Sequence, residues 1–438
     1  MKIGFQNIYS KWKLLPPFYK YLIAGIIYSM VFALIYLLEH SIGWIKVFPT
    51  IKNVATWDGG WYQEIKNEGY HFNSENPSAG FFPLLPYLWR WLHLSNYGIC
   101  VLLLSVSLIG IAWLSSVLKP NWISFFIALS FPSLFYFALP YTESLFLFFS
   151  VMALVGWKKN NSLLMFTGIF LASLSRVSAI FLVMGMAVAI VFEIKNRKEI
   201  LSAAVKIFSI SFAVAIGILL VLWIQYSQTG VWSAYFKAQS TFWERNFKLP
   251  TFPMGSPGGR MVLWMQIFGL WLGLWSVIAL IRILIIRYGK NIYSDSFFIT
   301  ACTFLALTWA SEIFFNPTWW NEHSWSGTWL VGLSRYMFVN PFFFIFIFHL
   351  FDLPAKKFSI LKIILILLGT LALYFCIIDM ELSEKHVWIE YIIWVTTGLL
   401  AYFLAYIFKF KPLRFAVIIV QLFIQVYYAG FFLSGSNV

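Results

Sequence analysis

Long apolar runs separated by short polar stretches make up most of this 438-residue chain. A helix needs about 20 apolar residues to cross a bilayer. By that measure the pattern predicts about 13 spanning helices, within a range of 11–13 because the segments in 142–193 are short. The expected spans are 21–39, 98–118, 121–139, 142–157, 162–175, 177–193, 207–226, 261–284, 297–313, 336–351, 360–378, 387–408 and 414–434. The predicted fold class is an all-α polytopic membrane protein with interfacial helices in long outer loops.

Composition excludes a water-soluble globular protein. The chain is 61% hydrophobic and 11% charged, whereas soluble domains carry about 45–50% apolar and about 25% charged residues. The three cysteines, Cys100, Cys302 and Cys376, form no CxxC pair. We therefore expect neither a disulfide framework nor a zinc site. No metal or other cofactor is expected, because the adjacent Glu322 and His323 do not by themselves make a metal site.

The net charge of +14 is distributed unevenly. With the N-terminus placed in the cytoplasm, about two thirds of the Lys and Arg residues fall in inner loops, as the positive-inside rule requires. Most Asp and Glu residues fall outside. The basic surplus thus indicates topology and contact with membrane lipid, and nucleic acid is not an expected partner.

Three of the predicted outer loops are long or rich in polar and aromatic residues: 40–97, 227–260 and 314–335. Long, chemically diverse loops commonly carry function. We therefore expect an active site on the periplasmic, extracytoplasmic or luminal side of a multi-pass protein. The loop 227–260 also carries Lys237, Arg245, Lys248 and Arg260, which suit an interfacial helix near lipid headgroups.

The first outer loop combines an apolar stripe with an acidic residue. Trp57, Trp61 and Ile65 recur at helical spacing, which predicts a short helix along the membrane surface. Asp58 stands at its beginning and suits either a helix N-cap or a chemical role. Gly59 and Gly60 leave room for a ligand or another backbone. Further on, Pro83 and Pro86 predict an extended, kinked return to the membrane.

Several motifs, taken together, resemble one enzyme family. They are Trp57-Asp58-Gly59-Gly60-Trp61-Tyr62, Glu68-Gly69-Tyr70, Phe81-Phe82-Pro83-Leu84-Leu85-Pro86, Pro140-Tyr141-Thr142-Glu143-Ser144-Leu145-Phe146, Leu174-Ser175-Arg176-Val177-Ser178, Ser334-Arg335-Tyr336 and Asn340-Pro341-Phe342. In this order they resemble elements of the second mannosyltransferase of glycosylphosphatidylinositol-anchor synthesis and its prokaryotic relatives. That family belongs to the GT-C superfamily of integral-membrane glycosyltransferases. Val177 and Ser178 replace the Ser and Asn of the family's pattern.

The resemblance implies one integral-membrane domain over 1–438. It would comprise the catalytic loop 40–97, the rest of a family-like core over 98–351, and C-terminal helices over 352–438 that carry no recognised motif. It also implies an inverting transfer of a sugar, mannose in the family, from a polyprenyl-phosphate donor. Asp58 matches the family's acidic base. The acceptor is left open among a glycolipid, a glycan and a protein.

Two arginines are candidates for the donor phosphate. Arg176 and Arg335 lie near outer helix ends without other charges around them. An arginine at membrane depth is costly and usually functional, and its planar fork suits a phosphate. The alternative is an internal salt bridge with Glu143 or Glu312, or snorkelling to the interface. Glu143 itself suits either acceptor binding or a pair with Arg176.

The remaining candidate substrate contacts are polar and aromatic. Trp57 and Tyr62 belong to the first-loop motif, and Trp320, Glu322 and His323 lie in a Trp-rich loop. Trp faces can stack on sugar rings, but an interfacial aromatic belt has the same composition. A transporter or flippase for a lipid-linked sugar is the chief alternative function. Transporters commonly contain internal repeats, and none is evident here.

Overall fold

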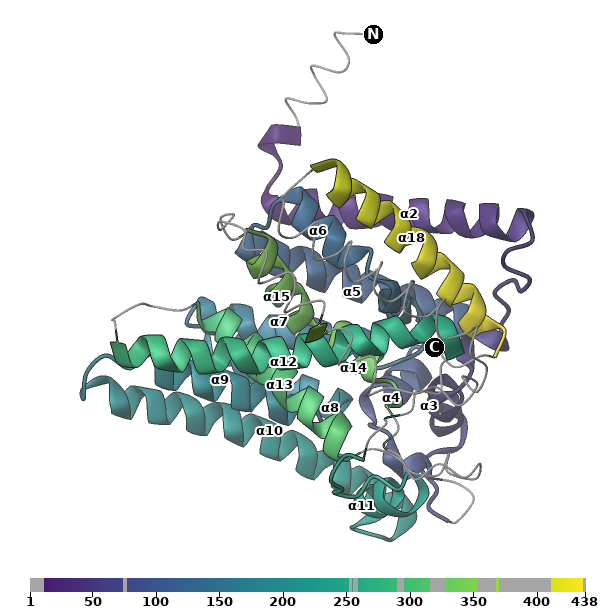
Figure 1. Ribbon diagram of the computed structural model, residues 1–438. Coiled ribbons are helices and arrows are strands. Elements are labelled where there is room, and N and C mark those ends of the chain that lie inside the picture. Colours follow the sequence, from purple (N-terminus) through teal and green to yellow (C-terminus); the bar gives the residue numbers. More distant parts are fainter. Residues whose placement is uncertain are drawn as a thin grey trace.

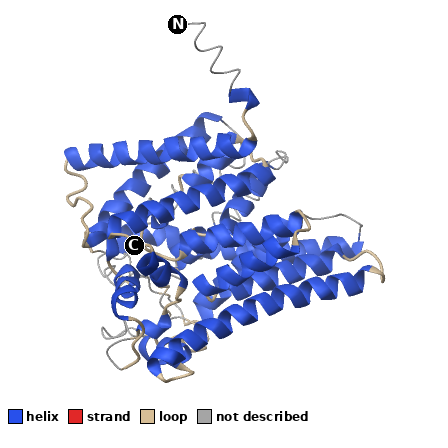
Figure 2. Cartoon of the chain, turned by 180° about the vertical axis from the view of Figure 1, so that it is seen from behind, coloured by secondary structure: helices blue, strands red, loops and turns tan. Residues whose placement is uncertain are grey.

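The computed structural model describes residues 12–73, 77–251, 254, 259–289, 295–315, 328, 330–352, 368–369 and 411–435. All regular elements in these ranges are helices (Figure 2). They are α2 Pro17–Ser41, η1 Asn53–Ala55, α3 Asp58–Glu68, η2 Ser78–Gly80, α4 Leu84–Trp91, α5 Asn96–Leu118, α6 Trp122–Leu129, η3 Pro132–Ala138, α7 Glu143–Lys158, α8 Ser162–Ser175, α9 Ala179–Glu193, α10 Glu199–Thr229, α11 Ala234–Lys237, η4 Ala238–Phe242, α12 Gly259–Gly289, α13 Ser296–Phe314, α14 Leu333–Phe338, α15 Pro341–Asp352 and α18 Lys411–Leu433.

Six of the described helices are long and apolar enough to cross a membrane: α2, α5, α10, Met265–Ile285 of α12, α13 and α18. A seventh span results if η3 and α7, which meet at 93°, are taken together. The chain is therefore a multi-pass membrane protein. The predicted count of about 13 is not confirmed, and the expected spans 360–378 and 387–408 lie almost entirely outside the described residues.

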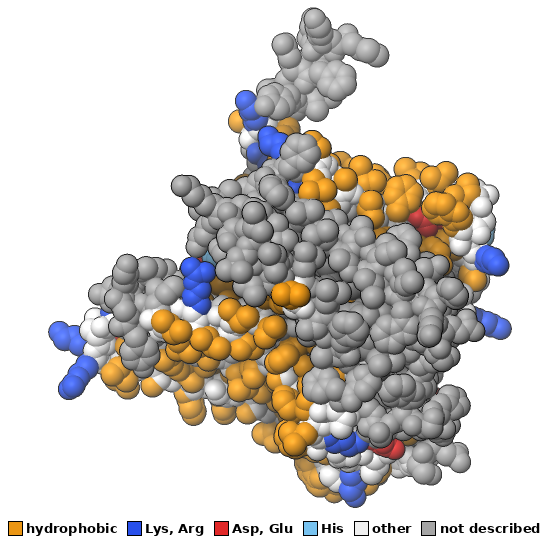
Figure 3. All heavy atoms as spheres, in the orientation of Figure 1, with side chains coloured by type: hydrophobic (Ala, Val, Ile, Leu, Met, Phe, Trp, Pro, Cys, Tyr) orange, Lys and Arg blue, Asp and Glu red, His pale blue; other side chains and the backbone are white. Residues whose placement is uncertain are grey.

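Large apolar side chains remain exposed on the outer helices, as lipid contact requires. On α10 they include Leu201, Phe208 and Trp223, and on α12 Ile281 and Ile285. Figure 3 shows hydrophobic side chains over these helices, with Lys and Arg gathered at the tip between α9 and α10. This surface is suited to hydrocarbon rather than water.

The helices form two groups joined by a central set (Figure 1). One group contains α2, α5, α6 and α18, and the other contains α8, α9, α10, α12 and α13. Between them lie α7, which packs on both α5 and α8, and α15, which packs on both α6 and α13. The short elements α3, α4 and α11 gather at one end of the bundle.

Two of the expected spans are broken at prolines. The segment 121–139 was predicted as one helix, but α6 ends at Leu129 and η3 begins at Pro132. The segment 336–351 divides between α14 and α15, which begins at Pro341. Proline has no N–H and clashes with the preceding turn, so both single-helix predictions were wrong.

The expected extended return at Pro83 and Pro86 was also wrong. Pro83 is the N-cap of α4, and Pro86 lies in the first turn of that helix. The N–H groups of a first helical turn have no partner within the helix. A proline is therefore tolerated there.

Three central helices are short for a membrane span. α7, α8 and α9 contain 16, 14 and 15 residues. At 1.5 Å per residue they reach about 21–24 Å, less than the roughly 30 Å of a bilayer's hydrocarbon core. The functional candidates gather at the ends of these helices, at Glu143, Ser175 and Ala179.

Candidate functional site

Asp58 is the first residue of α3, and its side chain does not cap the helix. The N-cap position belongs to Trp57, without a side-chain hydrogen bond. Asp58 Oδ2 lies 2.7 Å from Arg335 Nη2, and the Asp58 side chain remains 25% exposed. The N-cap interpretation of Asp58 was therefore wrong. Its carboxylate faces a guanidinium on α14 instead.

Trp57 adopts a backbone conformation that L residues rarely take. Its φ is 53° and its ψ is −127°, and its side chain is 42% exposed. Such conformations cost about 1–3 kcal/mol and cluster at functional sites. The turn at Trp57 also starts α3 directly before Asp58, where the helix dipole favours an anion. The local backbone thus supports a functional role for this motif.

The stripe of Trp57, Trp61 and Ile65 does not form one exposed face. Ile65 is buried with Tyr62 in a cluster that includes Leu85 and Trp89 of α4, and Trp61 stacks on Phe81. α3 is therefore fixed by packing against the rest of the first loop.

Glu143, the first residue of α7, bridges the two candidate arginines. Its Oε1 lies 2.5 Å from Arg176 Nη1 and 3.0 Å from Arg335 Nε. The Glu143 side chain is 3% exposed. A buried charge needs close partners, and here one carboxylate oxygen serves two guanidinium groups. The predicted pairing of Glu143 with Arg176 is confirmed.

The sequence reasoning missed a third arginine, Arg245. Its Nη1 and Nη2 lie 3.3 Å and 3.5 Å from the two carboxylate oxygens of Glu312 on α13. Burial alone would lower the pKa of Arg245, but Glu312 and the Tyr336 hydroxyl outweigh it and hold that pKa above its usual value. Glu312 thus pairs with Arg245, not with Arg176 or Arg335.

Little in the sequence singled out Arg245 from the other basic residues of its loop. The available signal was Glu312, an acidic residue near the end of an apolar helix. Such a carboxylate requires a cation. We refer to Asp58, Glu143, Arg176, Arg245, Glu312 and Arg335 as the charge cluster.

Tyr336 lies at the centre of the charge cluster. The guanidinium carbons of Arg176, Arg245 and Arg335 lie 5.1, 5.7 and 4.8 Å from its ring centroid. Arg335 Nη2 also donates a hydrogen bond to the Tyr336 hydroxyl at 3.0 Å. Cations at this range are attracted by the π face. One aromatic ring therefore holds three positive groups from three separate segments together.

Hydroxyl groups extend the charge cluster towards α3. Arg176 Nη1 donates to Thr142 Oγ1 at 3.3 Å, and the Tyr62 hydroxyl lies 3.4 Å from the same oxygen. Burial, and then the nearby Asp58 carboxylate, raise the pKa of Tyr62. Its phenol therefore stays neutral and keeps its proton for hydrogen bonding.

Five of the predicted site residues come together here. Ion pairs join Asp58, Glu143, Arg176 and Arg335, and Tyr62 is linked to Arg176 through the Thr142 hydroxyl. Trp57 adjoins them in sequence. Trp320, Glu322 and His323 lie outside the described residues. Both arginines form the internal ion pairs that were the alternative to phosphate binding.

Comparisons with known proteins identified no relative of this chain. No protein-family model, no curated protein and no solved structure matches the chain. The functional argument therefore depends on the residues of the site and on the motif resemblance.

Proposed function

We propose that this protein is an inverting glycosyltransferase. It would move a sugar, mannose by resemblance, from a polyprenyl-phosphate donor to an acceptor hydroxyl at the non-cytoplasmic face. Asp58 would act as the general base, and Arg176 and Arg335 would bind the donor phosphate. The acceptor belongs to a glycolipid, a glycan or a protein.

The observation that carries this proposal is the contact of Asp58 with Arg335, within a cluster that also holds Glu143 and Arg176. These residues come from four separate segments, and the motifs that resemble the family contain all four. Glycosyl transfer from a phosphate needs a proton acceptor for the incoming hydroxyl. It also needs positive charge for the departing phosphate. The charge cluster contains both groups in one place.

The proposed reaction is a single displacement at the anomeric carbon. The acceptor oxygen forms a bond to this carbon while its proton passes to the Asp58 carboxylate. The bond from the anomeric carbon to the phosphate oxygen breaks, and its electron pair leaves with the polyprenyl phosphate. Arg176 and Arg335 stabilise that charge. Attack opposite to the leaving group inverts the anomeric centre.

Substrate binding must separate Asp58 from Arg335, because a contact of 2.7 Å leaves no room for a sugar between them. A phosphate can replace the carboxylate as the partner of Arg335 Nη2. Glu143 would continue to hold Arg335 through Nε and Arg176 through Nη1. Asp58, no longer paired with a guanidinium, would then be available to accept the proton of the acceptor hydroxyl.

The test is sugar transfer from radiolabelled polyprenyl-phosphate mannose to a crude lipid extract, with the full chain in liposomes. We expect Asp58→Asn to lower the transfer rate by about 10²–10⁴-fold, because the amide cannot accept the proton. Glu68→Gln is the matched control. It changes an exposed carboxylate on the same helix, and its activity should stay near that of the wild type.

Equal melting temperatures for the three proteins would show that folding does not explain the difference. Undiminished transfer by Asp58→Asn would contradict the base assignment. Absence of transfer by the wild type, together with movement of the labelled lipid between leaflets, would favour the flippase instead.

A further inference from the structure

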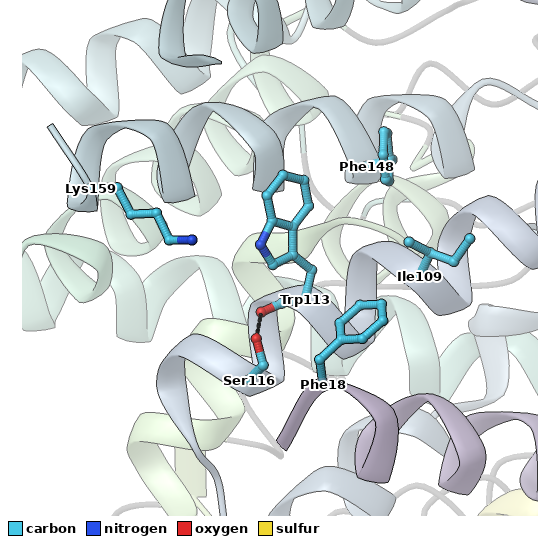
Figure 4. Close-up of a pocket in the computed structure, with 6 residues that line it drawn as sticks. All are labelled: Phe18, Ile109, Trp113, Ser116, Phe148 and Lys159. Carbon is cyan, nitrogen blue, oxygen red and sulfur yellow. Dashed lines mark hydrogen bonds between the residues drawn. The ribbon is translucent and has the colours of Figure 1, made fainter. Parts of the chain in front are cut away.

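A groove opens between helices outside the charge cluster. It lies between α2, α5 and α7, has a volume of about 430 Å³, and is lined by Phe18, Ile109, Trp113, Ser116, Phe148 and Lys159 (Figure 4). Lys159 follows the C-terminus of α7, whereas Glu143 begins that helix. The Lys159 end of the groove therefore lies at the opposite end of α7 from Glu143.

The groove has one cationic end. Lys159 is exposed, and Figure 4 shows its amine directed towards Trp113. No hydrogen-bond or ion-pair partner of this amine occurs among the described residues. Acidic side chains at the same end are engaged elsewhere: Glu193 accepts from Ser296, and Glu199 accepts from Asn196. The Lys159 amine is thus available to an anion.

The rest of the groove is mostly apolar. Its length is close to the thickness of the hydrocarbon layer of one leaflet. Phe148 precedes Lys159 by 11 residues, about 16 Å along a helix, and half of the hydrocarbon core is about 15 Å. The Trp113 and Phe148 rings lie 6.1 Å apart. Beside them α5 meets α7 at Gly110, where a Cβ would lie 2.5 Å from Leu147. This close contact between α5 and α7 limits the groove at its Phe148 end.

We propose that the groove binds an anionic phospholipid, with one acyl chain along Ile109 and Phe148 and the phosphate on Lys159. An amphiphile of this kind matches the cation at headgroup level and the apolar wall through one leaflet. A lysine amine is a flexible point charge that can reach a phosphate without fixed geometry. Other lysines at this end, including Lys158, would add attraction for an anionic leaflet.

The experiment is native mass spectrometry of the full chain released from nanodiscs of phosphatidylcholine and phosphatidylglycerol. We expect the wild type to retain phosphatidylglycerol preferentially. Lys159→Gln should lower that preference about fivefold, the effect of one lysine near anionic lipid. Lys198→Gln is the matched control, because it removes an exposed lysine at the same end outside the groove.

A second variant tests the apolar part of the groove. Ser116→Phe fills it and leaves Lys159 intact, so lipid retention should fall while the melting temperature stays near that of the wild type. An equal loss in Lys159→Gln and Lys198→Gln would overturn the proposal in favour of diffuse charge attraction. Displacement of the phospholipid by a tenfold smaller amount of polyprenyl phosphate would overturn the choice of lipid. A dimer that Ser116→Phe dissociates would identify a second copy as the occupant.

Discussion

Glu143 shows how a single residue can organise the charge cluster. Its carboxylate is almost fully buried, and its charge is compatible with burial because Arg176 and Arg335 both contact Oε1. Removal of one partner from a buried ion pair costs about 3–5 kcal/mol. Glu143 is therefore a positioning residue for both arginines. Asp58, with one guanidinium contact and greater exposure, is the more readily released carboxylate.

Gly59 determines how closely the start of α3 can approach Pro140, in the turn that precedes α7. A Cβ at Gly59 would lie 3.1 Å from Pro140 Cγ, whereas a Cβ at Gly60 would meet Ala55 O at an ordinary 3.5 Å. Alanine favours a helix over glycine by about 1 kcal/mol. We expect Gly60→Ala to raise the melting temperature. Gly59→Ala should raise it less or lower it, and should reduce sugar transfer by displacing Asp58.

Thermal unfolding in detergent, followed by the transfer assay, checks this difference. Identical melting temperatures and activities for the two variants would show that the close contact between Gly59 and Pro140 affects neither stability nor sugar transfer.

At the scale of elements, helix breaks bring the charge cluster together. α8 ends at Ser175, its C-cap Arg176 is extended with φ −157° and ψ 146°, and α9 begins three residues after Arg176. η3 turns into α7 at 93°, directly before Glu143. α14 ends before Asn340 and Pro341, and carries Arg335. The functional side chains therefore lie where helices end and the chain turns.

Asn340 joins α14 to α15. Its amide donates to the backbone oxygens of Tyr336 and Met337, and its Oδ1 accepts from the backbone N–H groups of Phe342 and Phe343. We expect Asn340→Ala to destabilise the protein by about 2–4 kcal/mol, because a helix cap is lost and buried groups lose partners. Sugar transfer should also fall, because α14 positions Arg335.

Asn161→Ala is the matched control, since it removes one cap bond to Leu164 at the exposed start of α8. Its cost should be about 0.5–1 kcal/mol. Both variants are compared by denaturant unfolding in detergent. An Asn340→Ala protein as stable and active as Asn161→Ala would refute the joining role.

On the scale of the whole molecule, the two ends of the helical bundle carry different groups. α3, which begins at Asp58 of the charge cluster, and α11 lie at one end, and the turn between α9 and α10 lies at the other (Figure 1). The bias of Lys and Arg towards the second end predicts that it is cytoplasmic. The charge cluster would then face the periplasm or a lumen.

Cysteine labelling in intact cells tests this orientation. In a background without Cys100, Cys302 and Cys376, Glu68→Cys should react with a membrane-impermeant maleimide. Arg197→Cys should react only after permeabilisation. The reverse pattern would contradict the predicted topology and move the proposed reaction to the cytoplasmic face.

The pattern of hydrophobic residues along the sequence was sufficient to predict a membrane protein and the positions of most helices. Apolar length alone predicted α2, α5, α13 and α18 closely, because a spanning helix makes its backbone hydrogen bonds within itself. The interruption at Arg176 was also visible, since a charge cannot continue an apolar run. The breaks at Pro132 and Pro341 were missed. Hydropathy is averaged over many residues and does not register a single proline, although a proline cannot be accommodated in the middle of an α-helix.

The pairing of the charges was decided by the tertiary structure. Asp58, Arg176 and Arg335 could be singled out one by one, because buried charge and glycine-rich loops are unusual in an apolar chain. Apart from the Glu143–Arg176 pair, which carboxylate meets which guanidinium depends on how α3, α7, α13 and α14 converge, and local spacing carries no information about that. Arg245 is the clearest case: it stands among other basic loop residues, and the fold alone brings it to Glu312 and Tyr336.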